Sequence, residues 1–450
     1  MAAVDLADVQ GLIVRGYSMG LGRHIGLGVR DPGAAAVFLR ALGDPGRAGV
    51  AVNSAERWAD KPDRAIAVGL TFSGLTALRM PGATLASFPA EFAAGAVARA
   101  AAVGDVGASA PENWLAWLRD PGLDILLFVS ANSTEALEAT TDQLRNAWAP
   151  GCVELGRQDG QRLPGDIAHF GYRDGLSQPT VVDLPVTGLP DQLPLAPLGA
   201  FLLGYDSAGL AAPAPVPARL GINGSFAAVR VLAQDVDAFA EFLTDSATRT
   251  GMSEELLAAK LCGRWRNGAP LVLSPDTDSP QPPILDKGLN DFDYVGDFHD
   301  ESGYRCPIGS HIRRMSPRGE RIIGNSPQLH RLIRRGIPYG PPYDPAAPRD
   351  GHERGLLGLF ICASLRDQFE FLMANWANDG TFTGGLGHTQ DPFLGGHVAG
   401  STARFTIPNP AGPVVLEGLP RFVHTRGGAY CFLPSMTALR SLADLAEPSP

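Results

Sequence analysis

The histidines are the first residues to consider for metal chemistry, because imidazole is the commonest side-chain ligand for protein-bound metals. Apart from His311, they lack the HxH, HExxH or HxxxH spacing that predicts a multi-histidine zinc or non-haem iron site. We interpret these others as core or surface residues. They are His24, His169, His299, His330, His352, His388, His397 and His424.

His311 lies in a segment that could hold an iron porphyrin. The segment reads CPIGSHIRRMSPR over residues 306–318. Three arginines follow the histidine: Arg313, Arg314 and Arg318. An imidazole can bind haem iron while a guanidinium pairs with a porphyrin carboxylate. Two other interpretations stay open: a solvated basic loop, since charge runs usually lie at the surface, or Cys306 as a thiolate ligand.

A second segment, GYRDGLSQP over residues 171–179, places an aspartate, Asp174, between two glycines. Gly171 and Gly175 would permit a tight turn and let a flat group approach the backbone closely. The aspartate then offers a carboxylate for proton transfer, or it serves only to cap the turn.

The third segment, HRLIRRGIPYG over residues 330–340, carries several arginines in a sequence typical of a strand. In strand geometry successive side chains point to opposite faces, so Arg334 shares one face with Leu332. Arg335 shares the opposite face with Arg331. At least one of these arginines must therefore point into the protein or be paired.

Composition excludes several classes of partner. Lys and Arg number 37 and Asp and Glu 47, which gives a net charge of −10, and no basic stripe with interleaved aromatics appears, so we expect no nucleic-acid partner. No long apolar span predicts a membrane helix. The first residues carry no basic region followed by an apolar run and a cleavage site, so we expect a cytoplasmic protein. The cysteines form no CxxCH motif, so a haem would be bound without thioether bonds.

The three segments must be positioned by mixed helix and strand structure. A chain of 450 residues with 54 Gly and 38 Pro predicts two domains or a duplicated unit with many turns. We expect strands in the first part at residues 10–16, 64–71 and 124–129. A helix is predicted after Asn132 and Ser133, which offer a polar cap. The proline-rich residues 177–198 predict the crossing between the two parts.

The second part repeats the rhythm of the first. We expect strands there at residues 199–206, 224–232 and 356–363. One helix is predicted after Asp235, and another by the apolar stripe of Phe369, Leu372, Met373 and Trp376. The pattern therefore predicts two related α+β halves.

The quoted segments together resemble one family, the dye-decolorising peroxidases. GYRDGLSQP resembles their GxxDG signature, CPIGSHIRRMSPR their proximal-histidine segment and LIRRGIPYG the segment of their distal arginine. Further segments look like family segments in family order: DVQGLIVRGY, GAFLLGYD, INGSFAAVRVLAQDV, GRWRNGAPL and GLLGLFICASLRDQFEFLMANWAND. The resemblance covers most of the chain.

The resemblance implies an α+β fold of two ferredoxin-like domains, each an antiparallel sheet with helices, with the haem in the C-terminal domain. We expect the first domain to span residues 1–176 and to end in the GxxDG loop. Residues 177–198 would form the crossing and residues 199–450 the haem-binding domain. The implied cofactor is haem b, iron protoporphyrin IX, bound non-covalently.

The resemblance also assigns roles to residues. His311 becomes the proximal iron ligand, and Asp391 the carboxylate that hydrogen-bonds its imidazole. Asp174 and Arg334 become the distal pair that activates peroxide, and Arg318 a partner for a haem propionate. Further haem contacts are expected from Gly175, Leu176, Leu359 and Phe360. Because Gly358 stands in a stretch expected to read LLF, which of Leu357, Leu359 or Phe360 faces the iron stays open.

The implied activity is reduction of hydrogen peroxide with oxidation of an organic donor such as a dye or a phenolic compound. Electron relay through aromatic residues is one interpretation of Trp265, Trp376, Tyr304 and Tyr339, and simple packing is the other. One alternative function is a haem-binding or haem-iron-handling protein on the same fold. A hydrolase using Asp174 with a metal is another. The presence of both Asp174 and Arg334 favours the peroxidase, because haem storage needs no acid-base pair.

Overall fold

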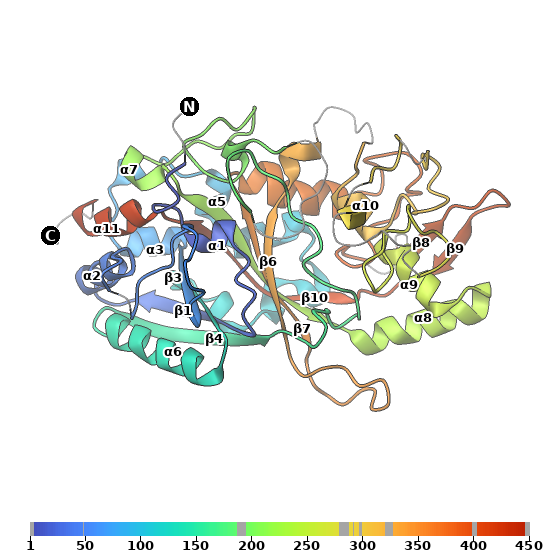
Figure 1. Cartoon of the computed structure of the whole chain (residues 1–450), viewed down its shortest axis with the longest axis horizontal. Helices are drawn as coiled ribbons and strands as arrows, with labels where there is room; N and C mark the ends of the chain where they lie inside the picture. The colour runs from blue at the N-terminus through green and yellow to red at the C-terminus, as the bar shows by residue number, and fades with distance from the viewer. Residues whose placement is uncertain are drawn as a thin grey trace.

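An antiparallel sheet of eight strands, in the order β4-β1-β3-β2-β10-β5-β7-β6, forms the centre of the molecule (Figure 1). The computed structural model describes residues 4–47, 49–186, 195–278, 288–290, 292–296, 299–319, 327–397 and 403–445. The first four strands are β1 Leu21–Val29, β2 Arg64–Leu70, β3 Ile125–Ala131 and β4 Cys152–Gln161. The others are β5 Ser225–Gln234, β6 Ile333–Tyr339, β7 Gly355–Cys362 and β10 Val423–Leu433. A separate hairpin pairs β8 Arg404–Ile407 with β9 Val414–Glu417.

The strand order repeats within the sheet. The first half has the order β4-β1-β3-β2 and the second half the order β10-β5-β7-β6. Counted along the chain within each half, both are the order fourth, first, third, second, which is that of a ferredoxin-like unit. The halves meet where Phe432 of β10 pairs with Leu70 of β2. The predicted fold of two ferredoxin-like units is therefore confirmed.

Helices cover the sheet and extend the second half. They are α1 Gly11–Val14, α2 Pro32–Leu42, α3 Phe72–Ala77, α4 Gly82–Leu85, α5 Ala90–Arg99, α6 Thr134–Trp148, α7 Ala218–Gly221, α8 Val236–Thr250, α9 Glu254–Cys262, α10 His311–Met315 and α11 Met436–Leu445. Short 3₁₀ turns are η1 Ala100–Val103, η2 Gly107–Ser109, η3 Pro111–Asn113, η4 Ala116–Leu118, η5 Leu198–Ala200, η6 Gly288–Asn290 and η7 Pro327–His330. Two π-helical turns are η8 Leu365–Glu370 and η9 Leu372–Ala377.

Two long helices begin where the sequence predicts them. The Ser133 side chain accepts a hydrogen bond from the Ala136 amide at 3.2 Å and caps α6. Asp235 caps α8 in the same way, through the Ala238 amide at 2.9 Å. Both caps satisfy amides that lack a partner within the first helical turn.

Two expected strands are wrong. Residues 10–16 contain the short helix α1, all four residues of which are buried. Residues 199–206 form the end of η5 and a turn closed by the Gly199 amide on the Asp206 carbonyl at 3.0 Å. Both segments contain a continuous apolar run, GLIV in the first and GAFLL in the second. Such runs report burial, and their composition does not distinguish a strand from a buried turn or helix.

The two halves are joined by more than the sheet. The C-terminal helix α11 packs on α2 of the first half, and Arg440 donates to the Gly43 carbonyl at 2.9 Å (Figure 1). At the sheet edges, a Cβ on Gly160 of β4 would lie 2.7 Å from the Ile337 side chain of β6. Glycine there lets the first and last strands of the sheet touch.

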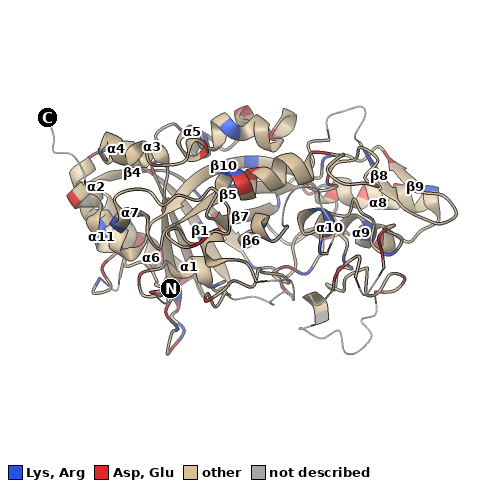
Figure 2. Cartoon of the chain, turned by 90° about the horizontal axis from the view of Figure 1, so that it is seen from above, with Lys and Arg blue, Asp and Glu red and all other residues tan. Residues whose placement is uncertain are grey.

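Several elements that the second half adds outside the sheet gather at one end of the molecule (Figure 2). Figure 2 shows α8, α9, α10 and the β8–β9 hairpin at the end opposite to α2 and α11, with acidic and basic residues interspersed along the chain. None of the helices in the described part combines the length and the hydrophobicity needed to cross a bilayer.

Candidate functional site

A large cavity lies between the second half of the sheet, helices α9 and α10, and the loop that follows β4. About 1570 Å³ of space in and around it is free of protein atoms, a volume that includes space open to solvent. The walls include residues from all three segments singled out in the sequence, namely Asp174, Gly175, Leu176, His311, Arg318 and Arg334, together with Phe360 of β7. Segments far apart in the chain therefore converge on one space that could take a ligand as large as a porphyrin.

His311 is the first residue of α10 and faces the cavity. Its Nδ1 donates to the Asp391 carboxylate, at 3.1 Å to Oδ1 and 3.0 Å to Oδ2. Asp391 is fully buried, and its Oδ1 also accepts from the amides of Phe393 and Leu394 at 2.9 and 2.8 Å. Because Nδ1 is engaged, Nε2 is the ring nitrogen available to a metal.

The carboxylate of Asp391 stays ionised in this setting. Burial alone would raise its pKa, but attraction to His311 and hydrogen bonds from His311 and the Leu394 amide lower the pKa below its ordinary value. An ionised Asp391 fixes the tautomer of His311 and makes the imidazole a stronger electron donor.

The arginines directly after His311 are not a solvated basic loop, so that interpretation is wrong. Arg313 and Arg314 are 1% and 0% exposed. Arg313 pairs with Asp300 at 3.0 Å, and Arg314 donates to the Trp376 carbonyl at 2.8 Å. Both side chains hold loops behind α10 together.

The rival ligand Cys306 lies outside the cavity wall. It is fully buried in a cluster with Trp265 and Tyr294, and burial raises the pKa of its thiol to about 11. A thiol in that state is a poor ligand, because the thiolate is the form that binds metals.

The Asp174 loop has the turn that the glycines predict. Gly171 and Gly175 adopt φ values of +87° and +70°, which side chains with a Cβ rarely adopt. The backbone amide of Asp174 donates to the Asp166 carbonyl at 2.8 Å. The side-chain carboxylate of Asp174 accepts from the Gly175 amide at 2.6 Å. The turn presents the Asp174 side chain at the cavity.

Arg334 ties strand β6 to this loop. The Nη2 atom of Arg334 donates to the Ser177 carbonyl at 2.5 Å. The side-chain amide of Gln178 accepts from the backbone amide of Arg334 at 3.1 Å and donates to its carbonyl at 2.8 Å. Arg335 points to the other face, as strand alternation predicts, and donates to the Leu12 carbonyl at 2.9 Å. Burial lowers the pKa of Arg335 to about 10.

Two expected orientations need correction. Arg331 lines the cavity together with Arg334, because β6 begins only at Ile333 and alternation does not extend back to residue 331. Leu359, expected on the haem face, packs with Leu357 in the core on the opposite side of β7. Phe360 is the residue of this stretch that lines the cavity.

Several charged residues of the wall were not singled out in the sequence. They are Asp105, Arg173, Arg230, Arg264 and Arg421. Arg264 and Arg318 converge on one residue: Arg264 donates to Asn290 Oδ1 at 2.8 Å and Arg318 to the Asn290 carbonyl at 2.6 Å. Burial and the charge of Arg318 lower the pKa of Arg264 to about 10. Arg264 belongs to GRWRNGAPL, one of the segments that resemble the family, so that resemblance was the sequence signal that could have pointed to this arginine.

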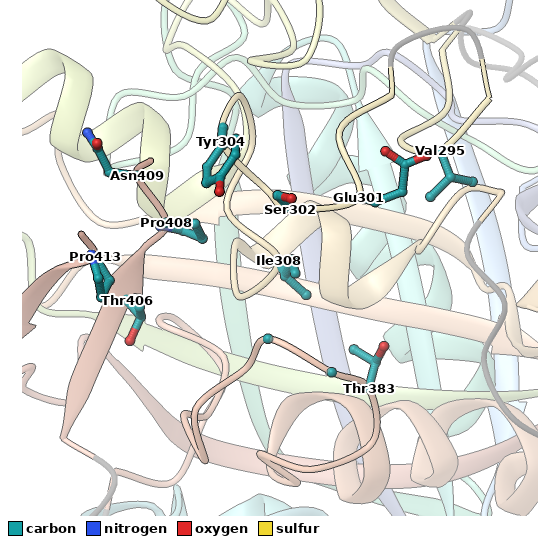
Figure 3. Close-up of a pocket in the computed structure, with 12 residues that line it drawn as sticks. Val295, Glu301, Ser302, Tyr304, Ile308, Thr383, Thr406, Pro408, Asn409 and Pro413 are labelled. Carbon is teal, nitrogen blue, oxygen red and sulfur yellow. The ribbon is translucent and has the colours of Figure 1, made fainter. Parts of the chain in front are cut away.

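The aromatic residues considered as relays are distributed differently. Trp265 lines the cavity, whereas Trp376 and Tyr339 are buried in the surrounding core. Tyr304 is 49% exposed and lines a second, open pocket with Ser302, Ile308 and residues of the β8–β9 hairpin (Figure 3). Within the described ranges, no cluster of three or more His, Cys, Asp or Glu side chains could hold a metal.

Comparison with known proteins identifies the family. "Peroxidase 2" of Mycetinis scorodonius is 30% identical over 406 residues, covering 85% of this chain and 77% of the relative. "Multifunctional dye peroxidase DyP2" of an Amycolatopsis species is 31% identical over 405 residues, covering 84% and 82%. The solved structure of a dye-decolorizing peroxidase in complex with 2,6-dimethoxyphenol is similar at a TM-score of 0.82 and 27% identity, covering 98% of this chain and all of the other. No protein-family model matches the chain. The relatives nevertheless establish that the chain belongs to the dye-decolorising peroxidase family, a family of haem peroxidases.

Proposed function

We propose that the cavity would hold haem b without a covalent bond to the protein, with Nε2 of His311 binding its iron. The donor set supports this proposal, because one imidazole backed by a carboxylate suits haem iron. The walls combine apolar side chains for the porphyrin faces with guanidinium groups for its two carboxylates. We assign Arg318, beside Arg264, to a propionate.

We also propose that residues 199–450 form the haem-binding unit, with residues 177–198 as the crossing. Most of the wall comes from this unit, including His311, Arg334 and Phe360. Residues 1–176 contribute Asp105 to the wall. They also contribute Asp174, Gly175 and Leu176, which belong to a loop that continues past residue 176 into the crossing.

Peroxide activation falls to Asp174 and Arg334. Bound iron porphyrin supplies the metal at which peroxide is reduced and the oxidising equivalents are stored. Heterolysis of the O–O bond requires that a proton leave one peroxide oxygen and arrive at the other. Asp174 accepts this proton and returns it, and Arg334 stabilises the negative charge that develops as the bond breaks. Asp391 keeps His311 oriented throughout.

A single observation carries the proposal: His311, held from behind by Asp391, faces the same cavity as Asp174 and Arg334. A haem carrier or haem-iron-handling protein would need the ligand and the arginines for the propionates, but not a carboxylate held at the cavity by a dedicated turn. The reducing substrate we propose is a dye or phenolic compound. The similar structure that contains 2,6-dimethoxyphenol supports the phenolic class.

The proposal is tested by haem binding and turnover. His311→Ala should abolish stoichiometric haem in the purified protein while the far-ultraviolet circular dichroism stays unchanged. His352→Ala, at an exposed histidine, is the matched control and should keep full haem content. A His311→Ala protein with stoichiometric haem and an unaltered Soret band would show that another residue is the ligand. Wild-type holoenzyme that binds haem but oxidises no dye with peroxide would favour the carrier.

A further inference from the structure

One row of the sheet on the cavity face is almost bare of side chains. Strand register places Gly336 of β6 opposite Gly358 of β7, Gly358 opposite Arg230 of β5, and Arg230 opposite Gly428 of β10. Directly paired residues point to the same face of a sheet. Arg230 lines the cavity, so the row lies on the cavity face of the sheet, and Gly336 at its edge-strand end lies beyond the cavity wall. The sheet therefore presents flat backbone at a place where strands ordinarily present side chains.

The ring of Phe360 uses the space above Gly358. A Cβ on Gly358 would lie 2.8 Å from Cε2 and 3.2 Å from Cζ of Phe360, and the next atom, the Arg230 carbonyl oxygen, is 3.8 Å away. The ring thus lies back over the glycine, with its centroid 5.8 Å from that of Phe369. Because real Cβ atoms do not approach other atoms so closely, a side chain at position 358 must push the ring away from the sheet.

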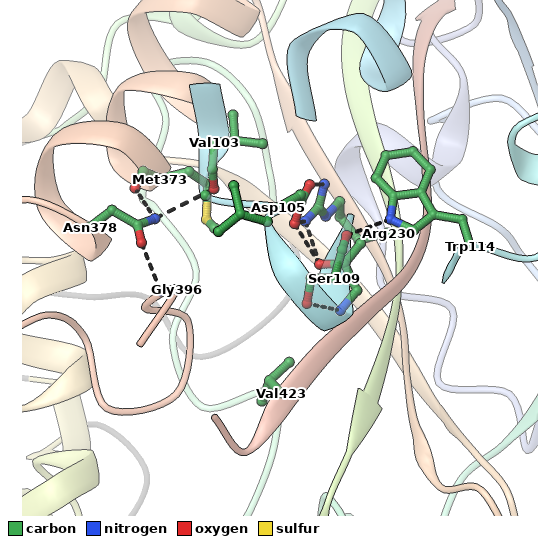
Figure 4. A network of polar contacts seen from close by, with 12 residues as sticks. Val103, Asp105, Ser109, Trp114, Arg230, Met373, Asn378, Gly396 and Val423 are labelled. Atoms are coloured by element: carbon green, nitrogen blue, oxygen red, sulfur yellow. Dashed lines mark hydrogen bonds and ion pairs between the residues drawn. The ribbon is translucent and has the colours of Figure 1, made fainter. Parts of the chain in front are cut away.

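Arg230, the one side chain of the row, is fixed by its own partners. Its guanidinium forms two hydrogen bonds with the buried Asp105 carboxylate, at 2.6 and 2.5 Å, and a third with Thr425 at 2.8 Å. Ser109 and Trp114 lie next to this pair in the same network (Figure 4). A guanidinium held in this way does not swing over Gly358, since that would leave a buried carboxylate without its partner.

The space that remains is bounded by groups suited to a small ring. Phe360 pairs with Arg334 across β7 and β6, so the side chain that carries the guanidinium assigned to peroxide activation leaves the sheet next to that of Phe360. Leu332 adds an apolar side chain to the same wall. Apolar and aromatic surface with one guanidinium is the usual lining for a planar organic molecule with a polar edge.

We propose that Gly358 opens a subsite for a single-ring planar organic molecule on the Arg334 side of the haem, and that this glycine determines which ligands enter. With the ring of Phe360 folded back over Gly358, such a molecule reaches the distal side directly. A larger residue at position 358 drives the ring of Phe360 into this subsite and leaves room only for ligands of the size of peroxide. The inference rests on the proposed function, because the distal side is the side of the haem opposite to the proposed ligand His311.

Ligand binding to the holoenzyme tests the subsite without turnover. The probes are imidazole, a planar ring, and cyanide, a two-atom ligand, both titrated by the shift of the Soret band. In Gly358→Leu the dissociation constant for imidazole should rise about tenfold or more, the scale of steric exclusion from a fitted pocket, and that for cyanide should stay within about twofold. Gly336→Leu makes the same change in the same row, at an exposed glycine outside the cavity wall, and should leave both constants unchanged.

A second variant keeps the test decisive. Gly358→Leu combined with Phe360→Ala removes the displaced ring and should restore imidazole binding. Four results would each overturn the subsite. In Gly358→Leu, these are an unchanged dissociation constant for imidazole or an equal weakening of cyanide binding. The others are an equal weakening of imidazole binding in Gly336→Leu and a double variant that does not regain imidazole binding. Failure of the proposed function gives a different result: wild-type protein would bind no haem, or cyanide would not shift its Soret band.

Discussion

At the scale of single residues, the two carboxylates of the site differ in what surrounds them. Asp391 is fully buried and accepts hydrogen bonds from one imidazole and two backbone amides. Asp174 is exposed at the cavity, and one backbone amide donates to its carboxylate. A carboxylate that must gain and lose a proton has to be reached by its substrate, whereas one that orients a ligand works best when saturated with donors.

We predict that Asp174→Asn slows the reaction of the ferric enzyme with peroxide by about a hundredfold or more, the typical effect of losing a general base. The amide keeps the shape of the turn but cannot accept a proton. Stopped-flow measurement of the Soret change after mixing with peroxide gives the rate. Asp166→Asn, on the same loop, is the control and should react at the wild-type rate. Equal rates in both variants would leave Arg334 as the sole distal catalyst.

For the proximal pair, Asp391→Asn should lower haem affinity or the peroxide rate by about 10- to 100-fold, as expected for loss of a partner behind a metal ligand. It replaces the charged acceptor on Nδ1 of His311 by a neutral amide. The reduction potential of the haem should rise at the same time, because the imidazole donates less electron density. Spectroelectrochemical titration measures this shift, and a potential equal to that of the wild type would contradict the role assigned to Asp391.

At the scale of secondary-structure elements, β6 separates two functions onto its two faces. Arg334 faces the cavity and holds the Asp174 loop, while Arg335 is held by backbone carbonyls of α1, at Leu12 and Ile13. The same alternation in β7 sends Phe360 to the cavity and Leu359 to the opposite core. The strands therefore direct adjacent residues to the cavity on one face and to the core on the other.

Two leucine variants test this division. Arg334→Leu should greatly reduce the peroxide rate per haem. Arg335→Leu should keep that rate but lower the free energy of unfolding by about 2 to 3 kcal/mol, because it removes charged hydrogen bonds to buried carbonyls. Urea denaturation and stopped-flow kinetics on haem-matched samples measure the two effects. Equal catalytic losses in both variants would show that the two side chains do not work on separate faces.

At the scale of the whole molecule, buried charge connects the halves. Asp105 lies between η1 and η2 of the first half and pairs with Arg230 of β5, and both side chains are almost fully buried. A second pair, Arg40 of α2 with Asp444 of α11, also joins the halves but is about half exposed. Removing one partner of a buried pair leaves the other charge uncompensated, whereas exposed pairs contribute little.

We therefore predict that Asp105→Ala lowers the free energy of unfolding by about 3 to 5 kcal/mol. Asp444→Ala should change it by less than about 1 kcal/mol, although it breaks a contact between the same halves. Urea denaturation of both variants at neutral pH makes the comparison. Similar losses for the two would mean that burial is not what gives the Asp105–Arg230 pair its importance.

Buried histidines make the stability of the whole chain depend on pH. Burial lowers the pKa of His24 from 6.5 to about 4, and burial also lowers the pKa values of His169, His330 and His424. Below pH 6.5 the unfolded chain binds a proton at His24 that the folded chain refuses until about pH 4, so stability falls as pH falls. The uptake of this proton by the unfolded chain alone should lower the free energy of unfolding at pH 5 by about 2 kcal/mol relative to neutral pH.

The variant His24→Leu isolates this effect. It keeps an apolar side chain against Phe128, the ring that His24 contacts edge-on, and removes the titrating group. Urea denaturation at pH 7 and pH 5 should show a smaller loss of stability in the variant than in the wild type. An identical loss in both proteins would mean that His24 is protonated in the folded state.

The sequence by itself determined the features that depend on neighbours along the chain. The caps Ser133 and Asp235 and the periodicity behind them specified α6 and α8. The glycines of GYRDG specified a turn with positive φ at both ends, because few other residues adopt that conformation. The order of short segments was enough to identify the family and with it the ferredoxin-like halves.

Only the tertiary structure decided which side chains share a space. Alternation separates Leu359 from Phe360, but which of the two faces the cavity depends on the strands and helices packed against β7. The arginines at 313, 314, 230 and 264 look alike in the sequence, yet two hold loops together and two line the cavity. A guanidinium buried without its partner is costly, and its partner comes from a distant segment, as Asp105 does for Arg230. Charge burial is a property of the assembled chain, and local sequence does not encode it.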